Sequence, residues 1–314
     1  MIKSIINRII RRLRNYKKIY CHRELRVSYG NENIDKTFYI IGVDYDTQGL
    51  LAIVKNVLVH IEYAIEKGYI PIVDMQNYSS QFQIDNTTNV WELFFLQPKG
   101  YGLEDIKKSR NIIISRNIDT WLGHSIFLTI LDDKNMRRHS KLKNIYQSYI
   151  RPNCILDNHI RELTDKCIGG KKNILGVLCR GSDYTQKRPQ GHPIQPTFGQ
   201  LAQKVDEYLD RHEIDFIYVA TEDEEYLEKF KNKYGKKVLY IDQQRFGNFK
   251  VEYISQLGIE HNDLIKLNMD YYASLNILSK CDYLIAGRTA GTIGVSFLAK
   301  EYKEYYYFKL GYYK

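Results

Sequence analysis

Short apolar runs alternate along this chain with longer stretches in which apolar residues recur at helical spacing. In the first half, residues 38–43 and 69–74 predict two strands, and residues 50–67 between them predict a helix. Short connections between these elements are typical of a βαβ unit, which implies a parallel sheet. The other elements predicted here are a short helix at 90–96, a strand at 111–115, and helices at 137–149 and 153–166.

The alternation is more regular in the second half of the chain. The predicted strands are residues 174–179, 216–220, 238–241, 283–286 and 305–308, and the predicted helices are residues 198–212, 224–234, 264–280 and 292–300. Strands separated by helical stretches favour a doubly wound parallel sheet. We therefore predict an α/β protein with two Rossmann-like doubly wound domains that face a cleft, at residues 30–152 and 153–314.

The positive charge of the chain lies mostly in its first residues. The 314 residues have a formal net charge of +9, and residues 1–26 contribute +8 of it, because they contain nine Lys and Arg residues against Glu24. Isoleucines recur at helical spacing between the basic residues, which predicts a basic amphipathic segment on an anionic membrane surface. The alternative is a solvated helix packed on the protein. The nearly neutral remainder argues against a nucleic-acid partner.

Composition restricts where the protein works. A hydrophobic content of 44% and a charged content of 26% are those of a globular protein. The five cysteines are far apart and form no CxxC pair, which argues for a reducing compartment and against a zinc site. With the basic segment, this predicts a cytoplasmic protein that is peripheral on the inner face of a membrane.

Polar and flexible residues follow three predicted strands at their carboxyl ends, where ligands bind in open α/β sheets. The strand at 174–179 is followed by Arg180, Gly181 and Asp183, and the strand at 216–220 by Glu222 and Asp223. The strand at 283–286 is followed by Arg288, Thr289, Ala290 and Gly291. A glycine-bearing turn before a helix offers free N–H groups to a phosphate, and arginines neutralise a diphosphate. These loops predict a nucleotide diphosphate site. The alternative is that the residues only cap helices.

Three ordered motifs, clearest over residues 170–300, resemble those of the α-1,6-fucosyltransferases and their bacterial Nod-factor relatives. They are Arg180-Gly181-Ser182-Asp183 followed by His192-Pro193-Ile194, YVATED at 218–223, and LSKCDYLI at 278–285. The resemblance implies a GT-B fold, an acceptor side in residues 30–152, a GDP-sugar donor site in residues 153–314, and inverting transfer without a metal or other cofactor. It also implies that Arg180 binds the β-phosphate and that Asp223 and Thr289 line the donor pocket.

The chain departs from this family at positions that matter for catalysis. The second arginine of the family motif is Gly181 here, its lysine is Tyr184, and its catalytic glutamate is Arg188. An arginine stays protonated, so Arg188 cannot take a proton from an acceptor hydroxyl, although it can supply charge to a phosphate. Another carboxylate would then be the base, or the transfer runs with little base assistance. The candidate carboxylates are Asp183, Asp44 and Asp46.

Two further motifs have a simpler interpretation. Asp44-Tyr45-Asp46 matches a DxD metal signature, but it follows the first strand, too early for the fold in which that signature binds metal, so we expect no metal site. His192 precedes a proline, which restricts it to extended conformations, so we expect it to shape the end of its loop.

Together these observations predict a fucosyltransferase-like enzyme that transfers a sugar from a GDP-sugar to a surface glycan or a lipid-linked oligosaccharide. The alternative is a non-catalytic glycan- or nucleotide-binding protein on the same fold, which the missing glutamate suggests.

The basic segment generates a direct test. Deleting residues 1–26 should abolish binding to anionic vesicles, because these residues hold nearly all of the net charge. Co-sedimentation with anionic and with neutral vesicles measures this, and unchanged binding of the truncated protein would remove the membrane interpretation.

Overall fold

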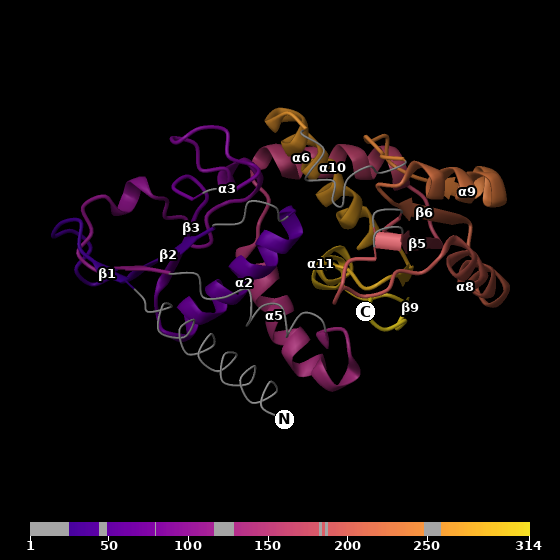
Figure 1. Cartoon of the computed structure of the whole chain (residues 1–314), viewed down its shortest axis with the longest axis horizontal. Helices are drawn as coiled ribbons and strands as arrows, with labels where there is room; N and C mark the ends of the chain where they lie inside the picture. Colours follow the sequence, from indigo (N-terminus) through magenta and orange to yellow (C-terminus); the bar gives the residue numbers. More distant parts are fainter. Residues whose placement is uncertain are drawn as a thin grey trace, which may run out of the picture.

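Two α/β units lie side by side in this protein, with α2, α5 and α11 between the two sheets (Figure 1). The computed structural model describes residues 25–43, 49–78, 80–115, 129–181, 184–185, 188–247 and 259–314. Residues 1–24 of the basic segment, Asp44, Asp46 and Asp183 therefore lie outside the described residues.

The first sheet contains three parallel strands and one antiparallel edge strand. Its order is β1 (Leu25–Val27), β4 (Ile112–Ile114), β2 (Phe38–Gly42) and β3 (Ile70–Asp74). Strand β2 pairs in parallel with β3 and β4, and α2 (Leu50–Glu66) makes the predicted crossover from β2 to β3.

Strand β1 corrects one sequence prediction. Leu25 and Arg26, which we assigned to the amphipathic segment, pair antiparallel with Ile114 and Ile113. The pattern missed this strand because it is short and its side chains are half-buried or exposed, which gives no apolar alternation. A deletion that tests membrane binding should therefore end at residue 24.

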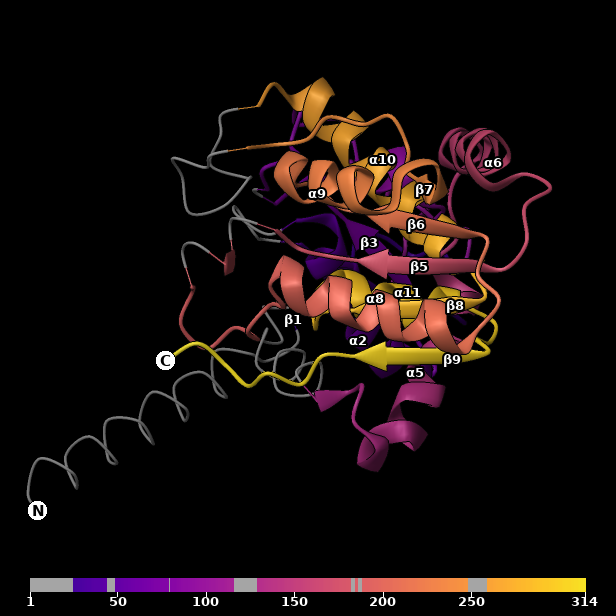
Figure 2. The same ribbon diagram turned by 90° about the vertical axis from the view of Figure 1, so that its right-hand side faces the viewer.

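The second sheet is wholly parallel (Figure 2). Its order is β7 (Val238–Leu239), β6 (Phe216–Ala220), β5 (Ile174–Leu178), β8 (Tyr283–Ala286) and β9 (Glu304–Tyr307). The helices between these strands are α8 (Phe198–Arg211), α9 (Glu224–Tyr234), α10 (His261–Leu278) and α11 (Ala290–Leu298), with a 3-10 turn at Gly235–Lys237. In chain order the strands run 3-2-1-4-5, which is the Rossmann order. The predicted α/β fold with doubly wound sheets is confirmed.

The two faces of β5 are covered by different helices. Leu175 and Val177 pack in a buried cluster with residues of α8 and α9, whereas Ile174 and Leu178 belong to the cluster that contains α10. This alternation follows from the two-residue period of a strand. A Cβ on Gly176 would lie 2.9 Å from the Leu278 side chain, so the glycine lets α10 pack closely on the sheet.

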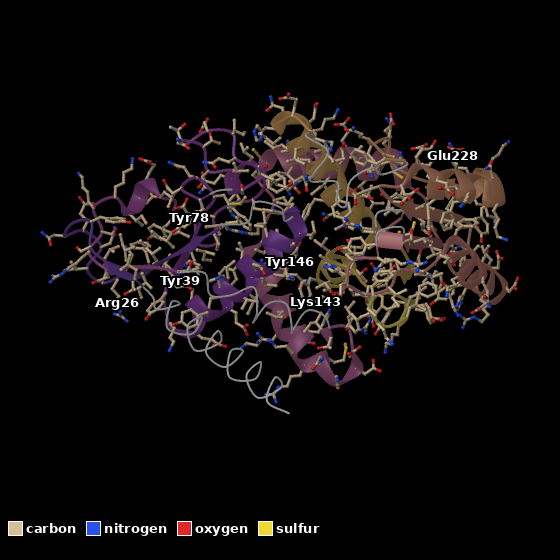
Figure 3. All side chains as sticks on the ribbon, viewed as in Figure 1. Arg26, Tyr39, Tyr78, Lys143, Tyr146 and Glu228 are labelled. Carbon is tan, nitrogen blue, oxygen red and sulfur yellow. The ribbon has the colours of Figure 1, made fainter. Side chains whose placement is uncertain are left out.

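Three helices contribute to a core that the two sheets share. They are α3 (Trp91–Phe94), α5 (Met136–Tyr149) and α6 (Cys154–Ile168). The 3-10 turn Asp133–Asn135 precedes α5, and Ile106 of the 3-10 turn Glu104–Ile106 packs in a separate cluster with Phe38 and Ile112 of the first sheet. One buried apolar cluster runs from Val73 and Trp91 through Tyr146 to Leu275 and Leu284. Tyr146 lies between the two sheets (Figure 3), and its hydroxyl is 2.8 Å from that of Tyr272. The domain boundary at residues 152–153 stays a prediction.

Within the described ranges, no helix is both long and apolar enough to span a bilayer.

The contact between α5 and α11 predicts an acid-sensitive step in stability. His139 Nε2 lies 2.8 Å from Ser296 Oγ. Burial, with a further contribution from the charge of Lys143, lowers the pKa of His139 below its ordinary value of 6.5. His139 therefore takes up a proton at a higher pH in the unfolded chain than in the folded chain. The contribution of neutral His139 to the stability of the fold is lost as the pH falls below about 6.5.

Urea unfolding at about pH 7.5 and about pH 5.5 measures this effect, because the two values lie on either side of the ordinary histidine pKa. We expect the free energy of unfolding to fall less on acidification in His139→Asn than in the unaltered protein. His159→Asn, at a residue that pairs with Asp270 on α10, is the matched control. An equal fall in the unaltered protein and the His139 variant would contradict the prediction.

Candidate active site

The carboxyl ends of β5, β6 and β8 bring together the loops that the sequence singled out. The order of the second sheet places β5 between β6 and β8, so the direction of winding reverses between β5 and β8. Ligands bind outside the carboxyl ends of strands at such a switch point. Leu178 pairs with Ala220 on one side and with Ala286 on the other, so Arg180, Glu222 and Arg288 come from neighbouring strand ends.

Arg180 is held by an aromatic ring and lies near a carboxylate. Its guanidinium carbon lies 4.7 Å from the ring centroid of Tyr184, a cation–π contact. Its Nη1 lies 4.0 Å from Oε2 of Glu222. The Arg180 side chain is 26% exposed, so the guanidinium reaches the solvent at the end of the strand while its surroundings restrict its position.

The turn after Arg180 packs against the loop after β6. A Cβ on Gly181 would lie 2.0 Å from Oδ2 of Asp223, so only glycine fits beside this carboxylate. Asp223 is 2% exposed and caps α9, because its Oδ1 accepts a hydrogen bond of 2.9 Å from the N–H of Tyr226. Asp223 therefore has a structural role in addition to the donor-pocket role that the resemblance implies.

Burial makes the neighbouring thiol unreactive. Cys179 is 2% exposed, and desolvation raises the pKa of this thiol to about 12, against a smaller opposing effect from Thr221. A thiol becomes nucleophilic only as a thiolate. Cys179 is therefore a core residue of the sheet.

The loop between β8 and α11 forms a capped helix N-terminus. Thr289 is the N-cap, and its hydroxyl accepts a hydrogen bond of 3.1 Å from the N–H of Thr292. Ala290 begins the helix, and a Cβ on Gly291 would lie 2.3 Å from the hydroxyl of Tyr271. The first turn of such a helix offers N–H groups and the positive end of the dipole to an anion.

Arg288 has a partner from the other half of the chain. Its Nη2 forms an ion pair with Oδ1 of Asp132, and its side chain is only 13% exposed. Its backbone carbonyl accepts a hydrogen bond of 2.9 Å from Gln195 Nε2. In this structure Arg288 connects the loop between β8 and α11 to the segment before α5, and its contact with a sugar donor stays a prediction.

The loop of residues 188–195 carries the other predicted residues. Arg188 is exposed and has a φ of 47°, which a non-glycine residue rarely adopts. His192 Nδ1 lies 3.1 Å from the hydroxyl of Tyr184, so His192 supports the ring that contacts Arg180. This contact is consistent with the shaping role predicted for His192.

The three carboxylates predicted as candidate bases, Asp183, Asp44 and Asp46, lie outside the described residues, and their role stays a prediction. Among the side chains that the structure describes, no three His, Cys, Asp or Glu residues gather closely enough to hold a metal ion. Metal-independent transfer stays a prediction.

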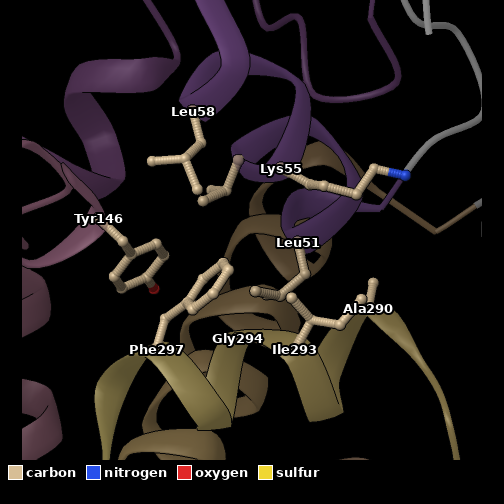
Figure 4. Close-up of a pocket in the computed structure, with 9 residues that line it drawn as sticks. Leu51, Lys55, Leu58, Tyr146, Ala290, Ile293, Gly294 and Phe297 are labelled. Carbon is tan, nitrogen blue, oxygen red and sulfur yellow. The ribbon is translucent and has the colours of Figure 1, made fainter. Parts of the chain in front are cut away.

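Two polar side chains in buried surroundings, Lys55 and Gln195, were not among the site residues predicted from the sequence. Lys55 lines a small apolar crevice between α2 and α11, and its ammonium points away from the apolar side chains (Figure 4). Burial lowers the pKa of Lys55. The available signal was a single charged residue within the apolar run of residues 50–61. Gln195 is 2% exposed, and a Cβ on Gly287 would lie 2.3 Å from its Oε1.

The chemistry of this edge suits a diphosphate. Arg180 supplies a guanidinium with several N–H donors, and the first turn of α11 supplies backbone N–H groups. Both lie at the point where the sheet reverses its winding. Glu222 beside Arg180 adds an acceptor that can bond a ribose or a base.

Solved structures with a similar fold identify the architecture of this chain. No family model and no curated protein matches the chain. NodZ α-1,6-fucosyltransferase soaked with GDP-fucose is similar with a TM-score of 0.52 and 13% identity, over 84% of this chain and 93% of that one. POFUT1 in complex with GDP is similar with a TM-score of 0.51 and 10% identity, over 87% and 99%. The chain has a fucosyltransferase-type fold, as the motifs predicted.

The contact between Gly181 and Asp223 yields a prediction for stability. Gly181→Ala should lower the free energy of unfolding by about 1–3 kcal/mol, because the new methyl group overlaps a buried carboxylate. Gly199→Ala is the matched control, since a Cβ at Gly199 in the first turn of α8 would have its nearest neighbour at 4.0 Å. Urea unfolding compares the two. Normal stability of Gly181→Ala would show that Asp223 can move.

Proposed function

We propose that this chain is a glycosyltransferase that uses a nucleotide diphosphate sugar, with a GDP-sugar as donor and fucose-like transfer. The observation that carries the proposal is that Arg180 and the start of α11 follow neighbouring strands, β5 and β8, at the switch point of a parallel sheet with Rossmann order. Of the similar structures, that of NodZ was soaked with GDP-fucose and that of POFUT1 is a complex with GDP. This likeness, at 10–13% identity, supports the donor class.

The geometry suits the charge that such a transfer develops. When a nucleoside diphosphate leaves an anomeric carbon, negative charge grows on the departing phosphate. A fixed guanidinium at Arg180 and the N–H groups at the start of α11 act on that charge, and losing one such donor typically lowers kcat by ~10²–10³. We infer inversion at the anomeric carbon from the family resemblance, with Asp183, Asp44 or Asp46 as the candidate base.

The acceptor belongs to the same proposal. A surface glycan or a lipid-linked oligosaccharide fits the basic amphipathic segment, because that segment would hold the enzyme on the inner face of a membrane where such acceptors lie. A cytoplasmic, peripheral location follows from the same argument.

The donor class can be tested by thermal unfolding with free nucleotides. We expect GDP to raise the melting temperature, since a ligand at 100 times its Kd stabilises a protein by roughly 2.7 kcal/mol. Arg180→Ala should lose most of this shift. Arg211→Ala is the control, because Arg211 pairs with Glu304 at the opposite edge of the sheet. Stabilisation by UDP and not by GDP would exclude the GDP-sugar assignment.

A non-catalytic nucleotide- or glycan-binding protein is the second candidate. It is favoured by Arg188, which stands where the related motif has its glutamate and is exposed in this structure. Donor hydrolysis with GDP-, UDP- and CMP-sugars separates the two functions. A binding protein would release no nucleotide from any of them.

A further inference from the structure

Arg180 needs support to act as a fixed phosphate ligand. A free arginine side chain has many rotamers, and holding it in one of them costs conformational entropy. The structure places the Tyr184 ring 4.7 Å from the guanidinium carbon. A guanidinium that lies on a ring keeps the N–H groups at its edge available for an oxyanion.

Tyr184 is in turn held by His192. The hydroxyl of Tyr184 lies 3.1 Å from Nδ1 of His192, and the two rings meet edge to face with centroids 5.3 Å apart. The hydroxyl contact fixes the ring from the end opposite its own backbone. The orientation of the ring that contacts Arg180 is therefore set by His192.

The backbone around His192 is anchored to residues 311–313. The N–H of Tyr313 donates to the carbonyl of His192 over 2.9 Å, and the N–H of Gly191 donates to the carbonyl of Tyr313 over 2.9 Å. The N–H of Ile194 donates to the carbonyl of Gly311 over 3.0 Å. Gly191 and Gly311 both have positive φ values, of 77° and 89°, which glycine adopts without strain.

We propose that Tyr184 and His192 are positioning residues, which hold the Arg180 guanidinium in the orientation that binds the donor diphosphate. We call the contacts from His192 through Tyr184 to Arg180 the relay, and residues 311–313 support it through their hydrogen bonds to residues 191–194. The proposal rests on the proposed function and deepens it, because it assigns a task to a tyrosine that stands where the related motif has a lysine. The relay replaces a second cation with a ring that orients the first one.

A double-mutant cycle on GDP affinity tests the relay without relying on turnover. Tyr184→Leu removes the ring, and Arg180→Gln removes the cation. When Arg180 is present, we expect Tyr184→Leu to weaken GDP binding about fivefold, which corresponds to the energy of a cation–π contact. In the Arg180→Gln background, the same substitution should weaken GDP binding less than about twofold. Isothermal titration calorimetry on the full chain measures all four proteins.

Two further variants separate positioning from lost packing. Tyr184→Phe keeps the ring and loses the hydroxyl contact with His192. It should weaken GDP binding about twofold and lower the melting temperature of the ligand-free protein by no more than the loss of one hydrogen bond does. His192→Ala should weaken GDP binding less in the Tyr184→Phe background than in the unaltered protein, because the hydroxyl contact is already lost and only the contact between the rings remains. Tyr29→Leu is the matched control, because Tyr29 is 48% exposed next to β1 and should leave the affinity unchanged.

The outcomes distinguish the relay from the function on which it rests. Coupling between Tyr184 and Arg180 supports the relay. An equal loss of GDP affinity with and without the Arg180 cation, or no loss at all, overturns the relay alone. If the unaltered protein binds no GDP, the proposed function fails and the relay with it.

Discussion

The carboxylate of Asp223 packs against the position where a side chain at residue 181 would begin, and the geometry of the loops after β5 and β6 depends on this contact. Asp223 is buried and caps α9, so turning its side chain away from the glycine would cost this cap. The chain leaving β5 must therefore pass Asp223 without a side chain at position 181. An arginine at this position, as in the related motif, has no room unless the cap of α9 moves. The difference from the related motif at position 181 is thus tied to packing.

The relation between the two sheets depends on helices that contact both. Helix α5 joins α2 and α11, with Arg138 paired to Glu62 on one side and His139 bonded to Ser296 on the other. The ion pair between Asp132 and Arg288 extends this contact to the loop that begins α11. A change in the orientation of the two sheets would strain the loop between β8 and α11, because this loop is attached to the second sheet and, through Asp132, to the segment before α5.

The periodic parts of the fold could be read from the sequence, and the contacts made by loops could not. Strand β6, helix α9 and strand β8 have the predicted bounds, since their apolar spacing decides both type and length. Arg180, Glu222 and Thr289 could be expected at one edge, because parallel strands end together. The contact between Tyr184 and His192 depends on turns at Arg188 and Gly191 with positive φ, which no periodicity encodes. Strand β1 is too short and too exposed to produce a pattern.

The strand order also determines when the candidate site can form. Strand β5 pairs with β8, so Leu175 lies beside Tyr283 although more than a hundred residues separate them along the chain. Such distant pairing is slow, because a long loop must close before the contact stabilises it. During synthesis the switch point cannot exist until β8 has left the ribosome. A nascent chain that ends before this strand would expose the apolar edge of β5 and would need protection from aggregation.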